Sequence, residues 1–181
     1  MKKILSACAV AAAFVAAPAF AQGYIGGGFG SSKLAGIDGG GTTGGNTNKS
    51  QVKVYGGFQF TPTWGVEAQF SDLGKRDILF NGVAAGSVKV SQFSIAGTGT
   101  LPLSSGFSLL GKLGVSANRV NGSGGIGSRS ATSALIGVGV SYNITPALSA
   151  RLEYEDFGTV AKYPDRTARA NAYSISLKYA F

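Results

Sequence analysis

The chain has no histidine, a single cysteine and few charged residues. Only 13% of its 181 residues are charged, about half of the roughly 25% that is usual in soluble domains. Without histidine, Ser-His-Asp catalysis, Cys-His catalysis and histidine metal sites are excluded. Cys8 has no second cysteine to pair with, so no disulfide forms within the chain. The composition argues against most classes of enzyme, and we expect no catalytic residue, no metal and no cofactor.

Long apolar runs are also missing beyond residue 21. No stretch there is long enough for a transmembrane helix, which needs about 20 apolar residues. Glycine, with 29 residues, is too frequent for stable amphipathic helices, because each one costs a helix about 1 kcal/mol relative to alanine. Helical architectures are thereby excluded.

Residues 1–21 have the three parts of a cleavable secretory signal peptide. Lys2 and Lys3 open the segment, residues 4–17 are apolar, and the Ala-Phe-Ala of residues 19–21 supplies the small residues that signal peptidase needs. Cleavage after residue 21 leaves residues 22–181 as one domain and lowers the formal charge from +8 to +6, because two lysines are lost. The alternative, a membrane-anchoring helix, lacks stop-transfer charges.

What the sequence does contain is an alternation of apolar and polar residues over segments of about ten residues. A tilted strand needs this length to cross a bilayer. Eight segments have the pattern: residues 22–30, 51–60, 64–72, 88–101, 107–118, 131–143, 148–157 and 171–181. The number is even, as in single-chain bacterial outer-membrane barrels.

The connections between these segments alternate in length. Residues 61–63, 102–106 and 144–147 form short connections, and residues 31–50, 74–87, 120–130 and 158–170 form long ones. Short and long connections must then lie at opposite ends of the sheet, as they do in barrels with tight periplasmic turns and long extracellular loops. The hairpin starts Trp64, Phe107 and Leu148 are spaced at similar intervals, which indicates a weak repeat of about forty residues.

The last segment displays the alternation clearly. Its apolar face is formed by Tyr173, Ile175, Leu177, Tyr179 and Phe181, and its polar face includes Ser174, Ser176 and Lys178. A soluble barrel buries the apolar face around a ligand, whereas a membrane barrel turns that face outward. The polar faces of all segments are rich in small residues, which suit a narrow interior and not a soluble surface. We expect the last strand to close the barrel against the first and its five apolar residues to act as the signal for the barrel-assembly machinery.

Bulky aromatic residues occur near both ends of the apolar face. Trp64, Phe60, Phe107 and Tyr142 lie by the short connections, and Phe70 and Tyr154 lie by the long ones. Aromatic residues at both levels are typical of the girdles at the two membrane interfaces.

The charged residues that fall well within the segments occupy only the polar face. They are Lys53, Glu67, Lys112, Arg151, Glu153, Glu155 and Lys178. Because a charge facing lipid costs about 2–4 kcal/mol, we expect these seven side chains to pair inside the barrel. They form either a plug of salt bridges or the lining of an ion path, and the plug is favoured because an eight-stranded barrel has room inside only for side chains.

The long connections, together with Arg119 directly before one of them, are basic, with nine lysine and arginine residues against three aspartates. Such an end attracts anionic polymers, for example the phosphates of lipopolysaccharide or a ligand on a host surface. No aromatic residues are interleaved with these cations, so we expect no nucleic-acid binding.

Two stretches carry a resemblance to a known family. Residues 144–154, Ile-Thr-Pro-Ala-Leu-Ser-Ala-Arg-Leu-Glu-Tyr, resemble the penultimate hairpin of the OmpA-like transmembrane barrels, and residues 23–30 resemble their opening strand. The resemblance implies an interior cluster that acts as a plug or gate, with Glu67, Lys112 and Arg151 in similar positions. Ser141 stands where the family would place a further acid. The periplasmic peptidoglycan-binding domain of the larger members is not expected here.

The sequence therefore predicts an all-β fold, an eight-stranded antiparallel up-and-down transmembrane β-barrel preceded by a signal peptide. We expect a monomer in the outer membrane, with both termini in the periplasm and the long loops outside the cell. Its expected role is structural or in surface interactions. The alternatives are a low-conductance pore, an adhesin or host-interaction protein, and, in a different class, a soluble barrel that carries a ligand. Barrel enzymes similar in outline use a histidine, so we expect no enzyme.

Overall fold

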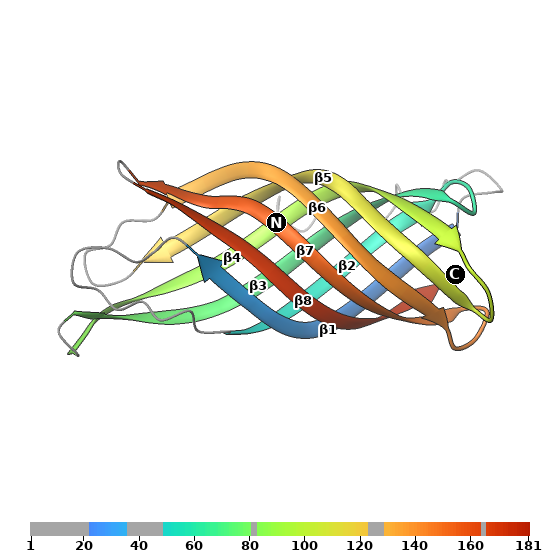
Figure 1. Cartoon of the computed structure of the whole chain (residues 1–181), viewed down its shortest axis with the longest axis horizontal. Helices are drawn as coiled ribbons and strands as arrows, with labels where there is room; N and C mark the ends of the chain where they lie inside the picture. The colour runs from blue at the N-terminus through green and yellow to red at the C-terminus, as the bar shows by residue number, and fades with distance from the viewer. Residues whose placement is uncertain (1–21, 36–48, 81–82, 123–128, 164–165) are drawn as a thin grey trace, which may run out of the picture.

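The computed structural model describes residues 22–35, 49–80, 83–122, 129–163 and 166–181. The segment predicted to be a signal peptide, residues 1–21, lies outside the described residues. Each strand pairs antiparallel with the next one along the chain, and the last pairs with the first, which closes a single barrel of tilted strands (Figure 1). The predicted eight-stranded up-and-down barrel is confirmed.

All the strands except β2, which has 11 residues, are longer than the roughly 9–11 residues that crossing a membrane requires. They are β1 (Gln22–Ala35), β2 (Lys49–Gln59), β3 (Trp64–Phe80), β4 (Val83–Pro102), β5 (Phe107–Gly122), β6 (Arg129–Asn143), β7 (Leu148–Tyr163) and β8 (Arg166–Ala180). Residues 74–87 and 158–170, expected to be long loops, are almost entirely strand, and that expectation was wrong. These segments continue their backbone pairing past the length that crosses a bilayer, so the β3–β4 and β7–β8 hairpins extend the barrel wall.

The three short turns lie at the end of the barrel where the C-terminus also lies (Figure 1). Two of them have the same construction. In the β2–β3 turn, Thr61 Oγ1 accepts a hydrogen bond of 2.9 Å from the backbone N–H of Trp64, and in the β6–β7 turn Thr145 Oγ1 accepts one of 2.9 Å from Leu148. A proline follows each threonine and needs no hydrogen-bond partner for its nitrogen.

Two bulges with the sequence Asp-x-Gly interrupt the pairing of β3 and β7. In each, the aspartate accepts a hydrogen bond from the glycine N–H, at 3.0 Å for Asp72 with Gly74 and at 2.8 Å for Asp156 with Gly158. The glycines have φ angles of 86° and 62°, a region that side chains with a Cβ rarely adopt. Each bulge places one extra residue in its strand and so shifts the register with the neighbouring strand.

The turns and bulges repeat at one constant spacing along the chain. The number of residues between Thr61 and Thr145 is the same as that between Asp72 and Asp156. The repeat extends to the interior. Ser32 Oγ donates a hydrogen bond of 2.9 Å to the carbonyl of Leu73, and Ser116 Oγ donates one of 3.1 Å to that of Phe157. The two halves of the barrel therefore share one plan, in which each half contains two of the shorter repeats that the sequence indicates.

Apolar side chains cover the outside of the barrel, as the sequence predicts for a membrane barrel. Trp64 is 64% exposed and Leu113 67%, whereas the buried side chains include many serines, glutamines and charged residues. The apolar band ends at register rows of polar outward-facing residues, one of which contains Asp72 and Arg119, and another Asp156 and Lys33. In the described residues there is no helix long and apolar enough to span a membrane.

The bulge glycines provide a test of this backbone. We expect Gly74→Ala to lower the free energy of unfolding by about 1–2 kcal/mol, because its φ of 86° brings a Cβ against the backbone. Gly97→Ala, whose Cβ would face outward with its nearest neighbour 3.8 Å away, changes it by less than about 0.5 kcal/mol. Urea unfolding in vesicles, followed by the fluorescence of Trp64, measures both. Equal losses for the two variants contradict the bulge.

Candidate functional site: a charged cluster inside the barrel

Six of the seven charged residues predicted to face inward meet in one cluster at the centre of the barrel. We call Lys53, Glu67, Lys112, Arg151, Glu153 and Glu155 the charged cluster; each is at most 5% exposed. They come from β2, β3, β5 and β7, strands that lie around the barrel, and reach its axis because alternate residues of a strand point to the same face.

Lys112 lies at the middle of the charged cluster. Its Nζ is 2.6 Å from Glu67 Oε1, 2.5 Å from Glu153 Oε1 and 3.2 Å from Glu155 Oε1. Lys53 Nζ lies 2.5 Å from Glu153 Oε2 and 3.2 Å from Glu155 Oε2. Positive and negative groups thus alternate across the interior, and every carboxylate has at least two cationic or polar partners.

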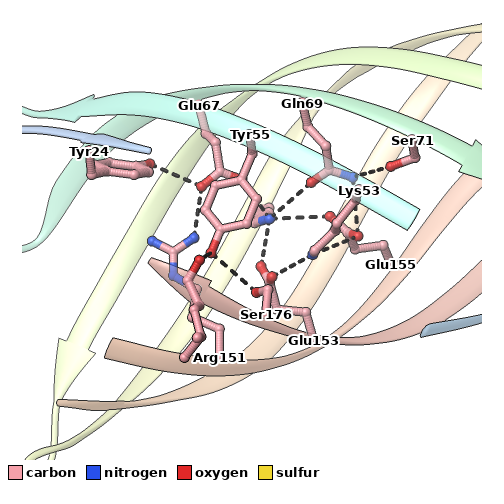
Figure 2. A network of polar contacts seen from close by, with 12 residues as sticks. Tyr24, Lys53, Tyr55, Glu67, Gln69, Ser71, Arg151, Glu153, Glu155 and Ser176 are labelled. Atoms are coloured by element: carbon pink, nitrogen blue, oxygen red, sulfur yellow. Dashed lines mark hydrogen bonds and ion pairs between the residues drawn. The ribbon is translucent and has the colours of Figure 1, made fainter. Parts of the chain in front are cut away.

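Arg151 closes the other side of the charged cluster, where its Nη1 lies 2.8 Å from Glu67 Oε2 (Figure 2). Its guanidinium stands 5.2 Å from the ring centre of Tyr24 and 5.1 Å from that of Tyr55. Such distances allow cation–π attraction, which is strongest in a desolvated site. Arg151 is therefore held by a carboxylate and by two aromatic rings.

Neutral side chains satisfy further polar atoms around the charged cluster (Figure 2). Tyr24 Oη donates a hydrogen bond of 3.1 Å to Glu67 Oε2, and Gln69 Nε2 donates one of 3.2 Å to Glu155 Oε2. The hydroxyls of Tyr55 and Ser176 lie 3.2 Å apart. Because buried charges are costly unless they are paired and hydrogen-bonded, this shell stabilises the charged forms inside the barrel.

Sequence reasoning missed Tyr24 and Tyr55, although both lie on the inward face. Across the β1–β2 register each tyrosine is opposite a glycine, Tyr24 opposite Gly57 and Tyr55 opposite Gly26. A Cβ on Gly57 would lie 2.6 Å from the hydroxyl of Tyr24, so only glycine leaves room for the ring. The available signal was this pairing of a large inward residue with glycine on the neighbouring strand.

Lys178, the seventh predicted interior charge, lies apart from the charged cluster. It is half-buried, and its Nζ stands 5.2 Å from the ring centre of Tyr24. It makes no ion pair with the residues that the structure describes. The register explains the separation, because Lys178 pairs with Ser149, nearer the short turns than Arg151.

A layer of apolar side chains fills the interior on the side of the charged cluster away from the short turns. This apolar layer consists of Leu73, Val90, Val120, Leu135, Phe157 and Val160, all at most 5% exposed. Sequence reasoning did not foresee it, because the inward face was expected to be polar throughout. The bulges are the local signal, since Leu73 and Phe157 are the central residues of the two Asp-x-Gly sequences.

The predicted girdle and assembly-signal residues all face outward. Trp64, Phe60, Phe107, Tyr142 and Phe70 are exposed, and Tyr154 is half-buried against Tyr173, with ring centres 4.8 Å apart. Tyr173, Ile175, Leu177, Tyr179 and Phe181 are each at least 50% exposed. None of the described residues forms a group of three or more side chains suited to hold a metal ion.

A closed barrel with an apolar exterior and a charge-paired interior defines the class of transmembrane β-barrels. The family model of the outer membrane protein beta-barrel domain matches residues 5–181. The chain belongs to this family, and its place is the outer membrane. The alternative of a soluble, ligand-carrying barrel is thereby set aside. A comparison with curated proteins gave no match.

Solved structures of similar fold come from several bacteria. Ail of Yersinia pestis, in complex with the heparin analogue sucrose octasulfate, is 21% identical, with a TM-score of 0.61 over 89% of this chain and 99% of that one. Neisserial surface protein A is 16% identical, with a TM-score of 0.63 over 88% and 97%. OprG from Pseudomonas aeruginosa is 12% identical, with a TM-score of 0.62 over 88% and 95%. At these identities the likeness establishes the fold alone.

The central lysine provides a test of the charged cluster. We expect Lys112→Met to lower the free energy of unfolding by about 3–5 kcal/mol, because it leaves three buried carboxylates with too few cations. The matched control is Lys89→Met, which breaks an exposed ion pair with Asp72 and costs about 1 kcal/mol or less. Urea titration of both variants in vesicles measures the difference. A loss for Lys112→Met no larger than that of the control contradicts the arrangement.

Proposed function

We propose that this barrel does not conduct ions and serves a structural or surface-interaction role, without enzymatic activity. The observation that carries the proposal is the filling of the interior by two successive layers, the charged cluster and the apolar layer. No side chain of either layer is more than 5% exposed. The segment of residues 1–21 acts as the signal peptide that directs export.

The two layers oppose ions by different physical effects. Within the charged cluster, an ion must displace a buried ion pair, and breaking such a pair costs about 3–5 kcal/mol. In the apolar layer, the six side chains themselves offer an ion no polar partner to replace its hydration water, which is costly. Ions are thus excluded even where one layer is weakened.

The short turns support an orientation with the termini in the periplasm. In bacterial outer-membrane barrels the tight turns are periplasmic and the longer connections extracellular. The ends of β1 and β8 meet at the short-turn end, where the N–H of Phe181 donates a hydrogen bond to the carbonyl of Gly23. The hairpins of the opposite end then lie outside the cell, and the five alternating apolar residues at the end of the chain meet the assembly machinery from the periplasm.

The outer end carries cations that support binding of anionic polymers. Lys33, Arg119 and Arg169 are exposed and make no ion pair with the described part of the chain. They stand at or just above the rows that end the apolar band, at the depth of lipid phosphates. The structure of Ail with a heparin analogue points to the same ligand chemistry. We propose lipopolysaccharide or a sulfated host polymer as the partner of this surface, with the barrel acting as a monomer.

Planar bilayer recording tests whether the interior of the barrel is closed to ions. We expect no conductance steps from the wild-type barrel, from Arg151→Ser or from Phe157→Ser, because each single variant leaves one layer in place. The combined variant opens both layers and conducts. Heat-modifiable migration in detergent serves as the control that each variant is folded. Reproducible wild-type conductance that Arg151→Ser abolishes would establish the alternative, a low-conductance pore lined by the charged cluster.

Binding of heparin tests the cationic surface. Replacing Lys33, Arg119 and Arg169 together by glutamine lowers the affinity about tenfold, if each exposed charge contributes about 0.5 kcal/mol. The control is Lys178→Gln, which removes one positive charge nearer the opposite end and leaves binding unchanged. The measurement uses barrels in zwitterionic vesicles at two salt concentrations, with lipopolysaccharide as competitor. Unaltered affinity of the triple variant refutes the assignment.

A further inference from the structure

The outer face of the barrel has an apolar recess of about 270 Å³ near the short turns. Its floor is formed by Gly99 on β4 and Gly111 on β5, and its walls include Trp64, Leu101, Leu109 and Val138. We propose that this recess binds one acyl chain of a phospholipid.

The strand register creates the recess. Along one row, Trp64 of β3 pairs with Gly99, Gly99 with Gly111, and Gly111 with Val138 of β6. In this row, two positions without side chains thus lie between the bulky Trp64 and Val138. A Cβ on Gly99 would lie 3.3 Å from the Trp64 indole, and a Cβ on Gly111 would meet nothing within 4 Å.

The shape of the recess suits a linear acyl chain and not a ring system. Gly97, the next outward residue on β4, is also a glycine, so about 7 Å of this strand has no outward side chain. This strip without outward side chains continues from the floor along β4, beyond the residues that line the recess itself. Thr63 and Thr100 line the recess as well, beside the short turn.

The surroundings of the recess determine its occupant. It is continuous with the outward face that contacts lipid, and none of its lining residues is charged. Between apolar surfaces in a membrane, association depends on close packing, so a recess that a flexible chain can fill favours that chain over lipids that only touch the convex wall. In the orientation proposed above, the bound lipid belongs to the inner leaflet, but the site itself depends only on the lipid-facing surface.

Trp64 is the single tryptophan of the chain and lies in the wall of the recess, so it reports occupancy directly. The experiment places the barrel in vesicles with a low fraction of phosphatidylcholine that carries brominated chains and records the quenching of Trp64. We expect more quenching than random contact gives. Gly111→Leu fills the floor of the recess. It reduces the initial slope of Trp64 quenching against the fraction of brominated lipid about twofold, since the preferred site is lost from the binding equilibrium. Gly27→Leu, on the outward face of β1, is the matched control and leaves it unchanged.

Native mass spectrometry provides a second readout that shielding of Trp64 by a new leucine does not affect. Wild-type barrel and the Gly27→Leu control retain one phospholipid through detergent washing, and Gly111→Leu retains none. Equal quenching and equal retention in wild type and Gly111→Leu overturn the proposal. So does a wild-type dimer that Gly111→Leu dissociates, because the occupant is then a second copy of this chain. Since none of these measurements involves the interior, a conducting barrel leaves the result unaffected.

Discussion

The cost of exposing a charge to lipid is the constraint on which the rest of this structure depends. Within the apolar band, it places the charged residues of the strands on the inward face. Eight strands enclose a space that side chains fill, so these charges must meet each other rather than water. The alternation of Arg151, Glu67, Lys112, Glu153 and Lys53 across the interior follows from that requirement.

The two halves of the barrel meet at this cluster. Corresponding positions of the two halves have the same Thr-Pro turn, the same Asp-x-Gly bulge and the same serine bonded to a bulge carbonyl. Glu67 and Arg151 also correspond to each other in this repeat, and they form an ion pair across the barrel. At this one pair of equivalent positions the two halves carry opposite charges, whereas the positions equivalent to the other four residues of the charged cluster are uncharged.

The bulges connect the wall with the interior above the charged cluster. By adding one residue to β3 and to β7, they change the register of the strand extensions, and at both bulges the central residue is a buried apolar one. The carbonyls that the bulges free are satisfied by Ser32 and Ser116 from inside. The apolar layer therefore exists without leaving these backbone acceptors unpaired.

The sequence by itself determined the number of strands, the closure of the barrel, the lipid-facing side and the inward placement of the charges, because these follow from a two-residue period and the positions of turns. Only the tertiary structure decided which inward residues meet. Whether Lys53 reaches Glu153 while Lys178 stays apart depends on register and tilt, which bring residues distant in the chain to the same height. The apolar layer, the tyrosine–glycine pairs and the Gly99–Gly111 floor likewise arise from cross-strand neighbours, which periodicity along one strand cannot reveal.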